Sequence, residues 1–141
     1  VLEWSRDGLR IVRRTGSYQI STNFVSSNFE PAEYPCKRYK IADEILGSSD
    51  GEVSVKLVRS VLSATCFEYF TFSPTVYSVI VDLVTGRMYI SFFHNFEDVV
   101  ELDLREELRK GEARYRLQDV FTIHSFAYSM FLDKMEHLVE P

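Results

Sequence analysis

The sequence predicts an α+β fold in which helices pack on an antiparallel sheet. Strand-like segments come first, then helix-like segments, then strands again, and such blocks are typical of α+β proteins. The chain has 141 residues, 45% of them hydrophobic and 14% aromatic, which is enough for a hydrophobic core. We therefore expect one domain over residues 1–141.

The first strands are expected near the beginning of the chain. Leu9–Ile11 is a short apolar strand, and Gly16 marks a turn after it. Residues 18–21 alternate in polarity, so they are predicted to be its partner strand. Residues 26–35 contain two prolines and no periodicity, which indicates a loop.

Two helices should follow this loop. Apolar residues recur at helical spacing over 37–46, and Gly47 is expected to end that helix. Ser54 is a suitable N-cap for the second helix. The second helix has an apolar stripe made of Leu57, Val58, Val61 and Leu62.

A hairpin is predicted over residues 75–93, with Thr85-Gly86 at its bend. Its strands are apolar on both faces, so we expect both faces to be covered by other layers. Residues 97–104 should form a third strand, and 105–110 a short charged helix. From about 112 to 138, apolar residues recur at roughly helical spacing and predict a helical tail.

Charge and composition narrow the possible functions. The net charge of −5 argues against a nucleic-acid partner, and no apolar run is long enough for a membrane span. No signal-peptide pattern occurs, and Cys36 and Cys66 form no paired motif, so we expect a cytoplasmic protein, although the two cysteines could pair. The histidines match no metal-ligand spacing, and we expect neither a metal nor a cofactor; they are His94, His124 and His137.

Four segments carry a resemblance to a known family. They are STNF at 21–24, YPCKRYKIADEIL at 34–46, SPTVYSVIVDLVTGRMYI at 73–90 and FEDVVELDLREELRKGE at 96–112. Their order and spacing resemble the C-terminal part of the linear-amide C–N hydrolases, which are N-terminal-nucleophile (Ntn) hydrolases. That family includes penicillin V acylase, bile salt hydrolase and isopenicillin N acyltransferase. The resemblance covers about two-thirds of the chain.

The resemblance implies an αββα sandwich and a small-molecule acyl amide as substrate. In the family, the thiolate of a cysteine at the processed N-terminus attacks the amide carbonyl, and the α-amine of that cysteine acts as the base. An asparagine at a strand end donates to the oxyanion, a role that falls here on Asn23. An arginine near the thiol favours the thiolate, a role that falls on Arg38.

One part of the family pattern is missing. The family's nucleophile lies far upstream of the Thr-Asn motif, whereas Val1 has no nucleophilic side chain and neither Cys36 nor Cys66 stands at the family's position. We therefore interpret Val1 as a cut end and the chain as a C-terminal portion. Alone, it should not hydrolyse penicillin V or conjugated bile salts. A sheet face left uncovered by the missing half should favour self-association.

A non-catalytic α+β module that binds or oligomerises is the alternative. In that case Asn23 only caps a strand–loop junction, Arg38 pairs with Glu30 or Glu33, and Cys36 is a small half-buried residue. The active-site interpretation predicts instead that Asn23 ends a strand and faces the same cleft as Arg38. The acyl group, the amine and the choice between hydrolysis and acyl transfer stay open.

Overall fold

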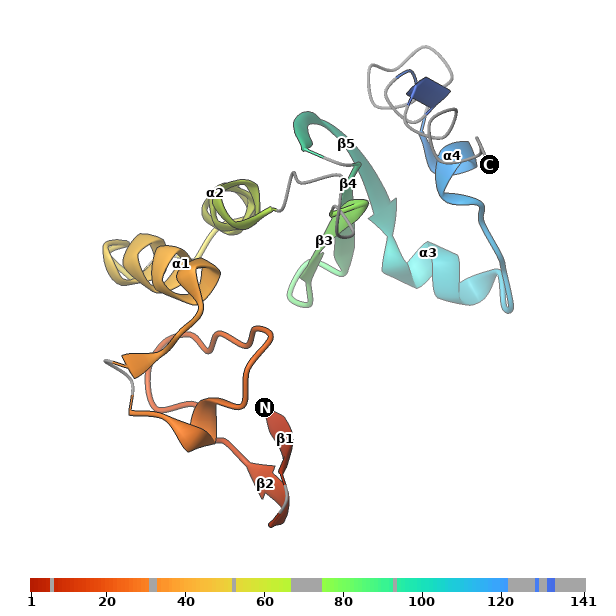
Figure 1. The fold of residues 1–141 in the computed structure, drawn as a ribbon. Coiled ribbons are helices and arrows are strands. Elements are labelled where there is room, and N and C mark those ends of the chain that lie inside the picture. The colour runs from red at the N-terminus through yellow and green to blue at the C-terminus, as the bar shows by residue number, and fades with distance from the viewer. Residues whose placement is uncertain are drawn as a thin grey trace, which may run out of the picture. The chain divides into compact units, whose positions relative to one another are not determined.

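The fold was analysed in a computed structural model, which confirms the α+β class. The residues that the structure describes are 1–5, 7–30, 33–51, 53–66, 75–92, 94–121, 129, 132 and 133. The chain divides into two compact units, Val1–Thr65 and Cys66–Pro141, and each is described by itself (Figure 1). The single domain over residues 1–141 stays a prediction.

The first unit begins with a small antiparallel hairpin. Strand β1 (Leu2–Ser5) pairs with β2 (Gly8–Ile11) from Leu2 opposite Ile11 to Ser5 opposite Gly8. The predicted strand at Leu9–Ile11 is therefore confirmed, but its partner comes before it. The strand predicted at 18–21 is wrong. Strand β2 pairs with β1 instead, and no described strand forms backbone hydrogen bonds with residues 18–21.

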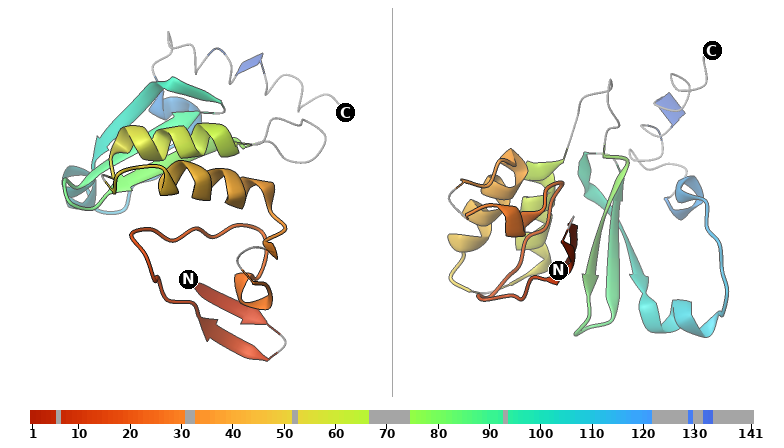
Figure 2. Two further views of the ribbon diagram at one scale, coloured as in Figure 1. Left: turned by 90° about the vertical axis from the view of Figure 1, so that its left-hand side faces the viewer. Right: turned by 60° about the horizontal axis from the view of Figure 1, so that its bottom comes forward.

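Two helices complete the first unit. Helix α1 (Lys37–Gly47) and helix α2 (Val55–Thr65) lie where the sequence predicts them, and they pack side by side (Figures 1 and 2). The predicted cap of α2 is confirmed, because the Ser54 hydroxyl accepts a hydrogen bond from the Leu57 N–H at 3.2 Å. Within the predicted loop, Ser26–Asn28 forms a single 3-10 turn, η1.

The Glu3 carboxylate connects the hairpin to η1. Glu3 is only 7% exposed, and it accepts hydrogen bonds from the Ser26 N–H at 2.8 Å, the Ser27 N–H at 3.0 Å and the Ser26 hydroxyl. The Ser26 hydroxyl makes the largest contribution to lowering the pKa of Glu3 from 4.5 to about 2; burial opposes this change, and the Ser27 bonds support it. The charged form of Glu3 therefore stabilises the folded unit.

Glu3→Gln should lower the free energy of unfolding of this unit at pH 7 by about 1–3 kcal/mol, the usual range for charge-assisted bonds to a buried group. The folded-state pKa lies below the unfolded one, so this contribution is fully present above about pH 5 and is lost as the pH falls toward 2. Urea denaturation followed by fluorescence of the single tryptophan, Trp4, measures it. Glu33→Gln is the control, since Glu33 is exposed. A gap between Glu3→Gln and the parent that is unchanged from pH 7 to pH 2.5 would contradict the prediction.

The second unit is built on a three-stranded antiparallel meander. Strands β3 (Tyr77–Asp82), β4 (Arg87–Phe92) and β5 (Asn95–Asp103) lie in the order β3-β4-β5 (Figure 2). The predicted hairpin and third strand are confirmed. At the bend, Gly86 has a φ of 71°, a left-handed conformation that glycine adopts without strain.

Short helices follow the sheet. Helix α3 (Leu104–Arg109) confirms the predicted charged helix, and its N-cap Asp103 accepts from the N–H groups of Arg105 and Glu106 at 2.9 and 3.1 Å. Helix α4 spans Leu117–Val120. The helical tail predicted from about 112 to 138 lies for the most part outside the described residues. Among the helices that are described, none combines the length and the apolar character needed to cross a lipid bilayer.

The core of the second unit centres on Phe92, which is 0% exposed. Its ring lies 5.3 Å from that of Phe121, and Ile90 is buried beside them. By contrast, Tyr77, Val79 and Val81 of β3 are 38–55% exposed, although the sequence predicts strands covered on both faces. In the described part of the chain β3 is an edge strand, so this apolar row remains open. Self-association stays a prediction.

Candidate functional site

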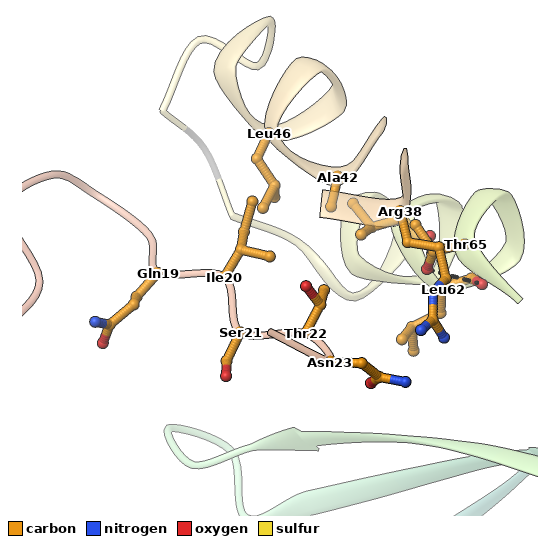
Figure 3. Close-up of a pocket in the computed structure, with 11 residues that line it drawn as sticks. Gln19, Ile20, Ser21, Thr22, Asn23, Arg38, Ala42, Leu46, Leu62 and Thr65 are labelled. Carbon is orange, nitrogen blue, oxygen red and sulfur yellow. Dashed lines mark hydrogen bonds between the residues drawn. The ribbon is translucent and has the colours of Figure 1, made fainter. Parts of the chain in front are cut away.

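A cavity of about 370 Å³ in the first unit contains both predicted site residues. Its walls come from residues 19–23 and from helices α1 and α2 (Figure 3). The side chains of Asn23 and Arg38 extend toward the same region of it, while those of Gln19 and Ser21 point away. The apolar part of the wall is formed by Ile20, Ala42, Leu46, Val61 and Leu62. The polar donors of Asn23 and Arg38 therefore lie together on one side of the cavity, its polar end, and aliphatic side chains line its wall.

An aromatic cluster brings Asn23 and Arg38 to one place. Phe24, next to Asn23, packs on Tyr39, next to Arg38, with ring centroids 5.7 Å apart. Tyr34 contacts both rings, at 5.0 and 4.6 Å, and Phe29 packs edge-on against Phe24 at 5.8 Å. Aromatic pairs of this kind contribute roughly 0.5–1.5 kcal/mol each beyond their burial. The cluster therefore closes the loop between the two site residues.

The sequence analysis missed this cluster. Its signal is an aromatic residue at every fifth position, namely Phe24, Phe29, Tyr34 and Tyr39. A spacing of five residues matches neither the period of a helix nor that of a strand, so it does not indicate either element.

The segment before Asn23 is held by side-chain hydrogen bonds instead of a strand ladder. The Tyr18 hydroxyl donates to the Asp43 carboxylate of α1 at 2.8 Å, a bond that raises the pKa of Tyr18. The Gln19 amide donates to the Val12 carbonyl at 2.9 Å. These bonds hold the segment before Asn23, and the Phe24–Tyr39 contact holds the chain just after it, so Asn23 is positioned although it does not end a strand.

Cys36 stands at the N-terminus of α1, beside the cavity wall. Burial alone would raise the pKa of its thiol. The Thr22 hydroxyl, the N–H groups of Tyr39 and Arg38, and the Arg38 side chain outweigh burial and hold the pKa below its ordinary value of 9.0. The buried Thr22 hydroxyl contacts the sulfur without reaching regular hydrogen-bond geometry. The half-buried position expected for Cys36 is confirmed, and its surroundings favour the thiolate.

Arg38 makes no ion pair with Glu30 or Glu33 in the part of the chain that the structure describes. The ion pair at the start of the helix, which the alternative interpretation expects, therefore does not position Arg38. Arg38 is half-buried, and its side chain faces the cavity (Figure 3). A cation in this position can attract a carboxylate or a carbonyl oxygen into the cavity.

Asn23 also borders a second cavity, of about 300 Å³, lined by residues 1–3 and 21–25. Its side chain is exposed, so a ligand can reach the amide. An asparagine N–H and a guanidinium directed at one space can bind an oxygen that carries or develops negative charge.

The three histidines that the sequence singles out are not among the described residues that line this cavity. His94 belongs to the second unit, whereas His124 and His137 lie outside the described residues. Within the described ranges no three His, Cys, Asp or Glu side chains gather as metal ligands.

In comparisons with known proteins, no family model, no curated protein and no solved structure matches this chain.

Proposed function

We propose that this chain is the C-terminal portion of a cysteine Ntn-type hydrolase or acyltransferase that acts on linear amide bonds. The observation that carries the proposal is that Asn23 and Arg38 line one cavity (Figure 3). They come from different elements, fifteen positions apart in the chain. Their chemical types are those that amide cleavage needs beside its nucleophile, an oxyanion donor and a cation.

In this proposal the attacking thiol and its amine belong to a residue upstream of Val1 in a longer protein. The thiolate attacks the carbonyl carbon, and the Asn23 amide donates to the oxygen as it becomes an oxyanion. Arg38 favours the thiolate and holds the polar end of the substrate. The strands of the second unit would belong to the αββα sandwich that the resemblance implies.

The aliphatic side of the cavity supports an acyl amide as the substrate class. Ile20, Leu46 and Leu62 offer a surface for a hydrocarbon or aryl acyl chain, with its carbonyl at the Asn23 end. Whether water or an amine accepts the acyl group depends on residues outside this cavity. Both outcomes are consistent with the same oxyanion donor.

The test compares residues 1–141 alone with the longer protein in single-turnover assays on an acyl-aminocoumarin, penicillin V and a conjugated bile salt. We expect an acyl burst from the longer protein, lost when its upstream cysteine becomes serine, and no burst from residues 1–141. A gene with a methionine codon directly before Val1 would overturn the proposal. So would a burst from residues 1–141 that is lost in Cys36→Ser, because it would make Cys36 the nucleophile.

An oligomerisation module is the second candidate. The observation that favours it is the exposed apolar row on the edge strand β3, formed by Tyr77, Val79 and Val81. Sedimentation tests it, because a monodisperse monomer at high concentration would rule out an oligomerisation module. Self-association is expected of both candidates, so the single-turnover assay is what separates them.

A further inference from the structure

Cys66 and His94 form a thiol–imidazole pair in the second unit. The Cys66 sulfur lies 2.9 Å from Nδ1 of His94, and both residues are half-buried. They are 28 positions apart, so no short sequence motif predicts the pair. Neither residue belongs to the cavity that holds Asn23 and Arg38.

At this distance the thiol proton can lie in a hydrogen bond between the two side chains. An imidazole at hydrogen-bond distance from a thiol can take that proton and leave a thiolate beside an imidazolium. No third ligand completes a metal site here, since the described residues contain no group of three potential ligands. The two side chains have the chemical types needed for nucleophilic chemistry at sulfur.

The backbone around His94 fixes the position of the imidazole. His94 lies in the turn between β4 and β5, and Phe92 on one side of it is fully buried. On the other side, Asn95 pairs with Phe92 across the turn, and its side-chain oxygen accepts from the N–H groups of Glu97 and Asp98 at 3.1 and 3.2 Å. Because the imidazole is already held in place, little conformational entropy is lost in positioning it when the thiol reacts.

We propose that Cys66 is a modification site whose thiolate, paired with the His94 imidazolium, exchanges with low-molecular-weight disulfides. The Cys66 sulfur attacks one sulfur of the disulfide, and a new S–S bond forms as the old one breaks. The departing thiolate takes the electron pair of the broken bond and the proton from His94, which becomes neutral. The disulfide is itself the oxidant, so the step balances without another reagent.

Thiol–disulfide exchange is the reaction that fits these two groups. It needs an attacking thiolate and an acid for the leaving group, and Cys66 and His94 supply both. Acyl transfer would also need a donor for an oxyanion. Partial exposure of Cys66 allows a small disulfide to reach the sulfur.

The test measures the rate at which 2-hydroxyethyl disulfide modifies Cys66 at pH 6, by peptide mass spectrometry. Cys36→Ser is the background, because the Cys36 thiolate is favoured too. Because His94 can take the thiol proton and so favour the reactive thiolate, adding His94→Gln should slow the reaction about tenfold. Adding Cys66→Ser instead should abolish the adduct.

Equal rates with and without His94→Gln would overturn the proposal, because the pair would then be a neutral structural hydrogen bond. A second measurement covers the case in which His94→Gln perturbs the turn. Unfolding the Cys36→Ser protein in urea separates Cys66 from His94, so the rate at pH 6 should fall about tenfold although exposure rises. A rate that stays equal or rises on unfolding would also overturn it.

Discussion

Asn23→Ala, made in the longer protein that the proposed function requires, should lower kcat for acyl-amide cleavage by about 10²–10³, the usual cost of losing one oxyanion donor. The alanine removes the only side-chain amide that extends into the polar end of the cavity among its described lining residues (Figure 3). KM should change little, because the lost bond strengthens only as the oxyanion forms. Steady-state kinetics on an acyl-aminocoumarin measures both constants.

Ser21→Ala is the matched control for this experiment. Ser21 lies two positions from Asn23 and lines the same cavity, but its side chain points away from the polar end (Figure 3). Its kcat should stay within about threefold of the parent, as a surface substitution of under 0.5 kcal/mol allows. A kcat for Asn23→Ala equal to that of Ser21→Ala would remove Asn23 from the site.

Phe92→Ala should destabilise the second unit by about 3–5 kcal/mol, the range for removing a buried phenylalanine ring. Phe92 is fully buried and packs on Phe121 and Ile90, so alanine leaves a cavity at the centre of this cluster. Domains are stable by roughly 5–15 kcal/mol in all, so this one change takes a large share of the stability. Urea denaturation followed by circular dichroism measures the loss.

Leu83→Ala controls for the size of the truncation. Leu83 is 86% exposed in the turn after β3, so its removal should cost less than about 0.5 kcal/mol. If Phe92→Ala were no more destabilising than Leu83→Ala, Phe92 could not be at the centre of the core.

Elements with strong local signals could be predicted from the sequence. Ser54 caps α2 through a bond to a residue three positions on, and Gly111, with a φ of 76°, follows α3. The hairpin of β3 and β4 needs only its own β-branched and aromatic residues and the bend at Gly86. In each case the residues that determine the element lie within a few positions of it.

The failures involve partners that lie farther away. Residues 18–21 have the composition of a strand, but a strand also needs a partner strand. The expected partner, β2, pairs with β1 instead. The open row on β3 has the same origin, because apolar residues show that a face can be covered without showing what covers it. Composition alone does not identify the partner.

The two residues of the candidate site come from the sequence, but their surroundings do not. Asn23 and Arg38 were chosen through the resemblance, and the structure brings them to one cavity. The aromatic contacts that close the intervening loop, and the Thr22 and Arg38 groups around the Cys36 sulfur, depend on tertiary structure. A one-dimensional pattern does not contain those distances.

The simple order of β3, β4 and β5 has a consequence for how the second unit forms. Each strand pairs with the next one along the chain, so the pairings join residues that are close in sequence. Proteins with such local contacts fold faster than those that must first close long loops. We therefore expect the sheet to assemble early, as soon as residues 77–103 are free to pair, whatever the rest of the chain has done by then.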